Sequence, residues 1–339
     1  MLYKIIVSLL LCSASLMAMC QVKTFDIGSL PKDIQTLVLV CAFKDHQTES
    51  EAIQKFKALT AVSKHTATIA KDSLFTALLM KDLVKKYQAE VLIIPLCLHS
   101  DRALQAFKHE FRKVIELLAQ EMQDLSGTLD LELPDDHIAT YRYALSEAVS
   151  NGDTVRVKNL LSSIGKFNND QWTLQPELMR VCNQCPSKEI VMLLLACGVD
   201  VNISVANATA LIYASRCGHI SIMKILLAFG SDISRLSREV GHSRRNTALM
   251  EAAQEGNIEA IRLLIAAGAD VNQQNTRGIA GLKRAYLSCE LPSDKKAKVI
   301  DTLLEAKAVP TNFGIYNYSK FYFSYILPKK VQTTVCGIV

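Results

Sequence analysis

The sequence predicts an all-α protein, in which a solenoid of stacked helix-turn-helix units follows a small helical domain. Three observations support this prediction. The chain resembles itself at intervals of about 33 residues, a period typical of helical repeat arrays. Apolar residues ahead of these intervals recur at helical spacing. The composition, 50% apolar and 21% charged over 339 residues, is that of a globular chain with two or three compact units.

The repetition is clearest between residues 207–234, NATALIYASRCGHISIMKILLAFGSDIS, and residues 245–272, RNTALMEAAQEGNIEAIRLLIAAGADVN. Counting back from the first leucine of the earlier segment reaches Leu178 and then Leu145, in two weaker copies. A degenerate further copy covers residues 277–310. The chain therefore contains an internal array rather than a single duplicated motif.

The sequence of each repeat in the array predicts two short helices. Leu249, Ala252 and Ala253 would form the apolar face of a first helix, and Gly256 would end it, because glycine readily adopts the left-handed conformation of a tight turn. A second helix follows and ends in the same way at Gly268. Neither helix can bury its apolar face alone, so consecutive units must stack.

This pattern, T-A-L-x-x-A-(A/S)-x-x-G-(H/N) followed by L-(L/I)-x-x-G-x-D-(V/I), resembles the ankyrin repeat, and the resemblance covers residues 141–310 as about five repeats. It implies binding of protein partners through hairpin tips and first helices rather than catalysis, with no cofactor. The family's Thr-Pro-Leu-His is replaced by TALI at residues 209–212 and by TALM at residues 247–250. We therefore expect the threonine–histidine hydrogen bonding usual in the family to be missing.

The connection between the third and fourth units is longer than the others, and it is basic. The spacing rises to about 38 residues through SRLSREVGHSRRN, which carries Arg235, Arg238, Arg244 and Arg245 against a single acid, Glu239. These arginines are predicted to contact an acidic partner surface. A solvated surface insertion without a partner is the alternative.

Residues 1–19 have the features of a secretory signal peptide. Lys4 closes a short positive segment, and residues 5–18 are apolar or small without a charge, too short a stretch to span a bilayer. The sequence thus predicts export, with action in a host cell or residence in the periplasm as destinations, and a buried N-terminal helix as the alternative. No later segment reaches about 18 uncharged apolar residues, so no stable membrane span is expected after signal removal.

Residues 28–71 carry a second resemblance. Leu30-Pro31 is followed by Asp33 and Ile34. Leu37 continues the helical spacing, and the segment LTAVSK, which contains Val62, follows about 25 residues later. The elements L-P-x-(E/D)-(I/L), a helix, and L-x-x-V-(S/C)-(K/R) resemble the F-box, whose helices dock on the Skp-type adaptor of cullin ubiquitin ligases. The F-box's later tryptophan is absent here.

The F-box resemblance implies an effector-type adaptor that joins a host ubiquitin ligase to a target held by the repeats. The alternative is an exported periplasmic or extracellular scaffold or inhibitor with no ubiquitin link, in which the N-terminal helices only cap the first repeat. Residues 72–140 are predicted to be a helical linker or capping region. Helices are expected over residues 74–87 and 100–125, whereas the apolar run over residues 90–98 fits either a strand or a buried helix.

No residue pattern predicts catalytic residues or a metal site. Cys182 and Cys185 form a C-x-x-C without the two further ligands of a structural zinc site. The ten cysteines are expected to act as small hydrophobic residues rather than as a disulfide framework. The net charge of +5 is too modest and dispersed for a nucleic-acid binder. Aromatic residues gather in the tail 311–339, where they would cover the open end of the stack or form an adhesive surface.

Overall fold

The computed structural model describes a helical chain. The described residues are 51, 54, 73–97, 101–128, 138–164, 174–184, 186–205, 208–237, 245–288, 291–310, 321 and 325. The chain divides into two compact units, Met1–Val114 and Ile115–Val339. Within the described part the only β feature is an isolated bridge between Val205 and Ala208, so the all-α prediction is confirmed.

The described part of the first unit consists of short helices and the beginning of a long one. In chain order these are α6 (Ser73–Tyr87), the 3-10 helix η2 (Gln88–Leu92), α7 (Ile93–Cys97) and the start of α8 (Asp101–Thr128), which continues into the second unit. The helices predicted over residues 74–87 and 100–125 are therefore confirmed. The apolar run over residues 90–98, which periodicity left open between strand and helix, is helical as far as Cys97.

Three phenylalanines lie in the otherwise aliphatic core of the described part of this first unit. Phe75, Phe107 and Phe111 are no more than 2% exposed, and the rings of Phe107 and Phe111 stack with their centroids 6.3 Å apart. The two rings are one helical turn apart on α8, so a single face of this helix supplies both. Leu79 and Leu83, one turn apart on α6, are equally buried.

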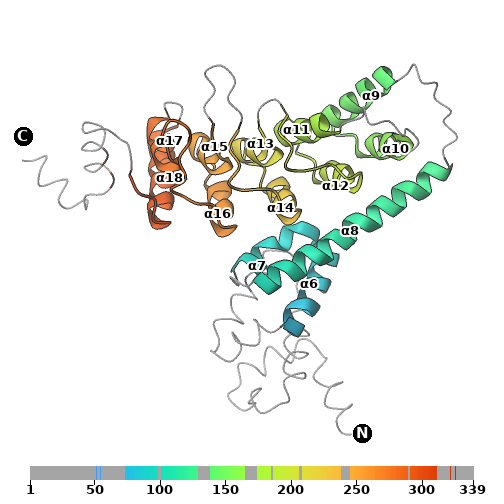
Figure 1. The fold of residues 1–339 in the computed structure, drawn as a ribbon, viewed down its shortest axis with the longest axis horizontal. Helices are drawn as coiled ribbons and strands as arrows, with labels where there is room; N and C mark the ends of the chain where they lie inside the picture. The colour runs from blue at the N-terminus through green and yellow to red at the C-terminus, as the bar shows by residue number, and fades with distance from the viewer. Residues whose placement is uncertain are drawn as a thin grey trace, which may run out of the picture. The chain divides into compact units, whose positions relative to one another are not determined.

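After the end of α8, the described helices of the second unit form a stack of five helix pairs, seen as two rows in Figure 1. The first helices make one row: α9 (Ile138–Asn151), α11 (Gln175–Asn183), α13 (Ala210–Cys217), α15 (Ala248–Glu255) and α17 (Gly281–Leu287). The second helices make the other: α10 (Thr154–Ile164), α12 (Lys188–Ala196), α14 (Ile220–Ala228), α16 (Ile258–Ala266) and α18 (Ser293–Glu305).

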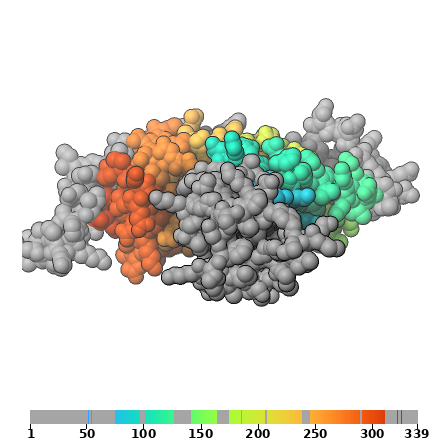
Figure 2. All heavy atoms as spheres, turned by 90° about the horizontal axis from the view of Figure 1, so that it is seen from below, coloured from blue at the N-terminus to red at the C-terminus, as the bar shows by residue number. Residues whose placement is uncertain are grey.

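Apolar packing between consecutive pairs holds this stack together. Every first helix contacts the next first helix, and every second helix contacts the next second helix. The leucines that mark the repeat are all no more than 3% exposed: Leu145, Leu178, Leu211, Leu249 and Leu282. Burial of one such side chain stabilises the fold by about 1.5–3 kcal/mol. Figure 2 shows the orange and red atoms of the last two pairs in direct contact.

The turns inside the pairs follow the predicted chemistry. Gly218 and Gly256 end α13 and α15 with φ of 74° and 73°, the left-handed region that glycine tolerates best. Thr247 Oγ1 caps α15 by accepting the N–H of Met250 at 3.3 Å. The equivalent hydroxyl of Thr209 is buried without a hydrogen-bond partner. The two threonines therefore contribute differently, although the sequence around them is similar.

Two aromatic residues of the tail pack against the last helix pair. Phe321 is 0% exposed and meets the ring of Tyr286 on α17 edge to face, with centroids 5.5 Å apart. Tyr325 approaches both Tyr286 and Phe321, at 6.3 and 5.4 Å. Edge-to-face pairs of this kind add to the apolar burial itself. These contacts favour the covering role predicted for the tail aromatics, whose other members lie outside the described residues.

Candidate protein-binding surface

One face of the first-helix row carries a line of partly exposed side chains. Two residues after the last four repeat leucines stand Arg180, Tyr213, Glu251 and Arg284, on α11, α13, α15 and α17. The guanidinium of Arg216 lies over the ring of Tyr213, 5.2 Å from its centroid. The line thus presents a cation, an aromatic ring, an anion and a cation in sequence. Tyrosine and arginine are residue types that protein interfaces favour.

A buried carboxyl lies near the beginning of this row. Glu177 on α11 is 7% exposed, and burial raises the pKa of its carboxyl. A backbone hydrogen bond and the charges of Arg180 and Arg142 oppose this shift only in part. Ala210 and Ala248 stand at the equivalent place in later pairs. A comparison of the repeats position by position would have found this departure, which the apolar pattern alone does not reveal.

Three connections lead from a second helix to the next first helix, and we call them tips: residues 197–209, 229–247 and 267–280. The fourth residue of each tip is an aspartate whose Oδ1 accepts the N–H of the residue two positions further on. The pairs are Asp200 with Asn202 at 2.8 Å, Asp232 with Ser234 at 2.9 Å, and Asp270 with Asn272 at 2.9 Å. This is the local side-chain-to-backbone bonding that favours a turn.

Asparagine side chains connect successive tips. Asn202 donates from Nδ2 to the carbonyl of Gly230 at 3.3 Å and accepts the N–H of Asp232 at 2.8 Å. Asn272 makes the same two bonds, at 3.3 and 2.7 Å, to the backbone that follows α18. Ser234 stands at the equivalent place in the middle tip, where Gln273 Nε2 instead donates to the Ser234 carbonyl at 2.8 Å. The tips therefore form one hydrogen-bonded edge.

The 229–247 tip is the long basic connection of the sequence, and it has a closed base. The N–H of Ser237 donates to the carbonyl of Asn246 at 2.9 Å, and the N–H of Asn246 donates to Ser237 Oγ at 2.9 Å. Arg235 and Arg245 flank this base and are exposed. The remaining predicted contact residues lie outside the described part of the chain: Arg238 and Arg244, and in the N-terminal segment Leu30, Pro31, Ile34, Leu37 and Val62.

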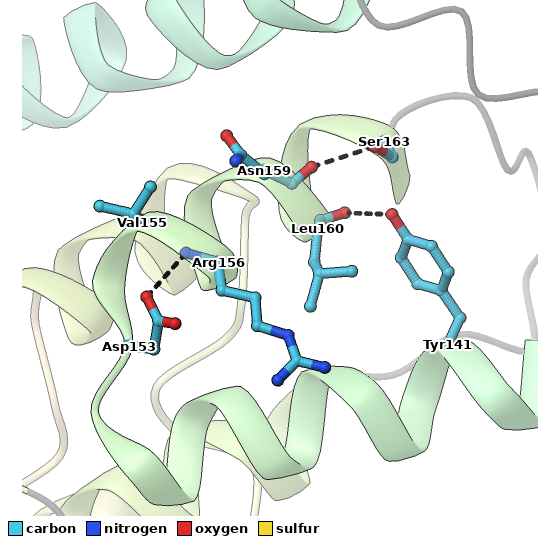
Figure 3. A pocket seen from close by; sticks show the side chains of 7 residues that line it. All are labelled: Tyr141, Asp153, Val155, Arg156, Asn159, Leu160 and Ser163. Carbon is cyan, nitrogen blue, oxygen red and sulfur yellow. Dashed lines mark hydrogen bonds between the residues drawn. The ribbon is translucent and has the colours of Figure 1, made fainter.

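A depression of about 320 Å³ opens at the first helix pair (Figure 3). Tyr141 OH donates to the carbonyl of Leu160 at 3.2 Å along its wall. Its charged groups are engaged, because Asp153 Oδ1 accepts the N–H of Arg156 at 3.0 Å and the Arg156 guanidinium pairs with Glu147 at 3.3 Å. The other lining residues are Val155, Asn159 and Ser163. This lining resembles the side of a terminal repeat more than a catalytic cleft.

The cysteines divide into two kinds. Cys182 is 0% exposed, and burial raises the pKa of its thiol, so it packs as the small hydrophobic residue that was predicted. Its C-x-x-C neighbour Cys185 lies outside the described residues. Cys217 forms no disulfide and is exposed, so the prediction of apolar packing is wrong for it; Cys197 is exposed at the surface as well, but the atoms around it still desolvate its thiol and raise the pKa to about 11. Each stands where its helix ends, and Cys217 Sγ lies 3.6 Å from the carbonyl oxygen of Asn183.

Among the described residues, no three His, Cys, Asp or Glu side chains are placed to hold a metal ion. None of the described helices has both the length and the apolar character needed to cross a membrane. The side chains that stand out there are polar and charged groups on the first helices and on the tips.

Stacked helix pairs joined by aspartate turns define a helical repeat protein. Residues 178–275 match the family model of ankyrin repeats, in three copies, so ankyrin repeats are present as predicted. A search of curated proteins returns no significant match. Ankyrin repeats indicate a protein–protein interaction scaffold, and proteins built from them are generally not enzymes.

Sequence reasoning missed two buried asparagine side chains of the tips. Asn246 and Asn275 are 2% and 5% exposed, and Asn275 Nδ2 donates to Asn246 Oδ1 at 3.0 Å. The two residues are 29 apart in the chain. Each asparagine precedes a first helix by a few residues, so their place in the repeat was readable. Their contact was not, because it needs the stacking of two pairs.

Proposed function

We propose that this chain is a non-enzymatic scaffold that binds a partner protein across the first-helix face and the tips. The observation that supports it is the ordered line of half-exposed charged and aromatic side chains on α11, α13, α15 and α17, next to a hydrogen-bonded edge of tips. A surface fixed by stacked helices loses little conformational entropy when a partner binds.

The test compares the proteins captured by three forms of the full chain. The face variant, Arg216→Glu/Leu287→Arg, changes exposed side chains on α13 and α17; the matched control, Arg262→Glu/Val155→Arg, makes the same changes on exposed second-helix residues. We expect quantitative mass spectrometry to find a protein held by wild type and control and at least tenfold depleted with the face variant. If no protein shows this pattern while all three forms keep their helical circular dichroism, the proposal is wrong.

The finer proposal is that the scaffold is an effector-type adaptor, exported and acting in a host cell. Its support is the sequence resemblance of residues 28–71 to the F-box, with Leu30, Pro31, Ile34, Leu37 and Val62 as the contact residues for a Skp-type adaptor. A pull-down of that adaptor should recover wild type and lose the Leu30→Ala/Pro31→Ala variant. Equal recovery of both forms, or recovery of neither, would exclude the adaptor role.

An exported scaffold or inhibitor without a ubiquitin link is the second candidate. The apolar segment of residues 5–18 supports export by itself and requires no F-box function. Cell fractionation separates the two destinations: mature chain in the host cytosol favours the effector, and mature chain confined to the periplasm favours the scaffold. Full-length chain retained in the producing cell would contradict both.

A further inference from the structure

We propose that Arg235, Arg245 and Arg277 form one preorganised cationic surface, the arginine edge, which binds an extended acidic segment of the partner protein. This inference rests on the proposed scaffold function and names the chemistry of the partner. The sequence pointed to the first two of these residues as part of one loop. The structure adds Arg277 from the following tip, and it shows how the backbones that carry all three arginines are fixed.

The base of the 229–247 tip brings Arg235 and Arg245 together. Ser237 and Asn246 exchange two hydrogen bonds of 2.9 Å, one between their backbones and one through Ser237 Oγ. Arg235 lies two residues before this pair and Arg245 directly beside it. The positions of the two arginines are therefore set by the closed base, whatever path the intervening residues take.

A buried asparagine pair fixes Arg277 to the same base. Asn275 Nδ2 donates to Asn246 Oδ1 at 3.0 Å, and Asn275 Oδ1 accepts the N–H of Arg277 at 2.9 Å and that of Ile279 at 3.0 Å. Asn246 Nδ2 in turn donates to Glu251 Oε1 at 2.7 Å. One continuous chain of hydrogen bonds thus runs from the base of the 229–247 tip to the backbone of Arg277.

Two carboxylates near this edge, those of Asp232 and Asp270, accept hydrogen bonds from groups of their own tip. Asp232 Oδ1 accepts from the backbone and hydroxyl of Ser234, at 2.9 and 2.7 Å, and Asp270 Oδ1 accepts from the backbone of Asn272 at 2.9 Å. Arg235 and Arg277 are exposed and form no ion pair with a carboxylate among the described residues. Guanidinium groups in this situation suit carboxylates, which they bind through two parallel hydrogen bonds.

The spacing favours an extended peptide. Packed helices lie about 8–10 Å apart, so arginines on successive tips are offset by about that distance. An extended chain rises about 3.3 Å per residue, so acidic residues three apart would meet successive tips. Nucleic acid is the less suitable ligand, because the described residues of these two tips include no aromatic ring on which a base could stack after Phe229 at the end of α14.

Fluorescence anisotropy of a labelled peptide with the sequence GSEGSEGSEGS tests this edge on the full chain at low and at physiological salt. The variant Arg235→Ala/Arg245→Ala/Arg277→Ala should bind at least tenfold more weakly than wild type. The control Arg112→Ala/Arg262→Ala/Lys298→Ala removes the same charge from exposed helix residues and should stay within twofold. A peptide of equal composition with its glutamates adjacent, GSEEEGSGSGS, should bind more weakly to wild type than the spaced peptide.

Three results would overturn the inference: no peptide binding by wild type, an equal loss in both triple variants, or tighter binding of a dT12 oligonucleotide that the first variant abolishes. The last result would assign the edge to nucleic-acid phosphates. The conservative variant Asn275→Asp keeps the acceptor for the Arg277 backbone but loses the donor to Asn246, so it should weaken peptide binding less than the triple variant. A partner captured through the first-helix face without peptide binding would contradict the arginine edge alone and leave the scaffold function standing.

Discussion

Two glycines of the fourth helix pair offer a measurement of how tightly successive pairs fit. Gly256 ends α15 with φ of 73°, and Gly268 follows α16 with φ of 92°. Alanine in the left-handed region costs about 1–2 kcal/mol through its Cβ alone. The surroundings differ, because a Cβ on Gly256 would lie 2.6 Å from Leu291 Cδ2 and 2.9 Å from Lys295 Cε, whereas a Cβ on Gly268 meets nothing within 4 Å.

The added methyl group therefore tests the contact between the fourth and fifth pairs. For Gly268→Ala we expect a loss of about 1–2 kcal/mol in the free energy of unfolding, from the backbone conformation. For Gly256→Ala we expect about 1 kcal/mol more, the lower end of the destabilisation from overpacking, because the two atoms that the methyl group meets are ends of side chains that can shift. Lys295 Nζ, which donates to the Glu255 carbonyl at 3.2 Å, would have to move as well.

Urea unfolding of the full chain, followed by far-ultraviolet circular dichroism, measures both variants against wild type. The midpoint should fall in the order wild type, Gly268→Ala, Gly256→Ala, with unchanged slopes. Equal midpoints for the two variants would refute the reasoning. They would mean that Leu291 and Lys295 yield without loss, and that the turn between α15 and α16 is not held by the next pair.

Three further outcomes follow from single side chains. Thr247→Val should lower the free energy of unfolding by about 1 kcal/mol, because it removes a helix cap. Thr209→Val should be neutral or stabilising, since the buried hydroxyl of Thr209 has no hydrogen-bond partner. Equal effects of the two substitutions in urea unfolding would contradict this difference. The raised pKa of Glu177 means that its stabilising contribution is present below the unfolded-state pKa and lost as pH rises through the folded-state value. Glu177→Gln should therefore flatten the loss of thermal stability between acidic and neutral pH, and an unchanged pH profile would count against it. Phe321→Ala should cost about 3–5 kcal/mol in the part of the unfolding that includes the last pair and increase the fluorescence quenching of Tyr286 by acrylamide; unchanged quenching would show that the tail does not cover it.

The sequence predicts the repeat architecture well because every unit repeats the same constraint. An apolar residue that recurs at a fixed period must be buried in each copy, and the repeat leucines, such as Leu211 and Leu249, are at most 3% exposed. Glycines that end the first helices were equally readable, since Gly218 and Gly256 adopt a conformation that other residues avoid. The conformation of the apolar run at residues 90–98 could not be predicted, because a strand and a buried helix have the same apolar pattern over so short a stretch.

Contacts between helix pairs could not be predicted from the sequence, because they join residues that are distant in the chain. Asn257, for example, donates from Nδ2 to the carbonyls of Ser215 and Arg216 in the preceding pair, at 3.1 and 2.8 Å. The sequence shows only that an asparagine stands where His219 stands one unit earlier. The same holds for the candidate binding residues. Arg235 was predicted from the basic composition of its loop, but its proximity to the next tip follows only from the stacking of the helix pairs.

The middle tip shows how the array accommodates its one long insertion. The regular bridge is an asparagine such as Asn202, which bonds forward to the backbone of the next tip and so fixes the distance between tips. Ser234 is too short to span that distance, and its hydroxyl bonds to Asp232 within its own turn. The distance to the next tip is therefore not fixed by a side chain directly after Ser234, and this is where the extra residues of the long tip are inserted. Ser237 and Asn246 then close the insertion at its base and return the chain to register before α15. Among the three tips that the structure describes, the forward bridge is absent only where the insertion follows. We therefore infer that the exchange of asparagine for serine and the lengthened tip are one structural change, which adds a basic loop while the helices beneath it stay in register.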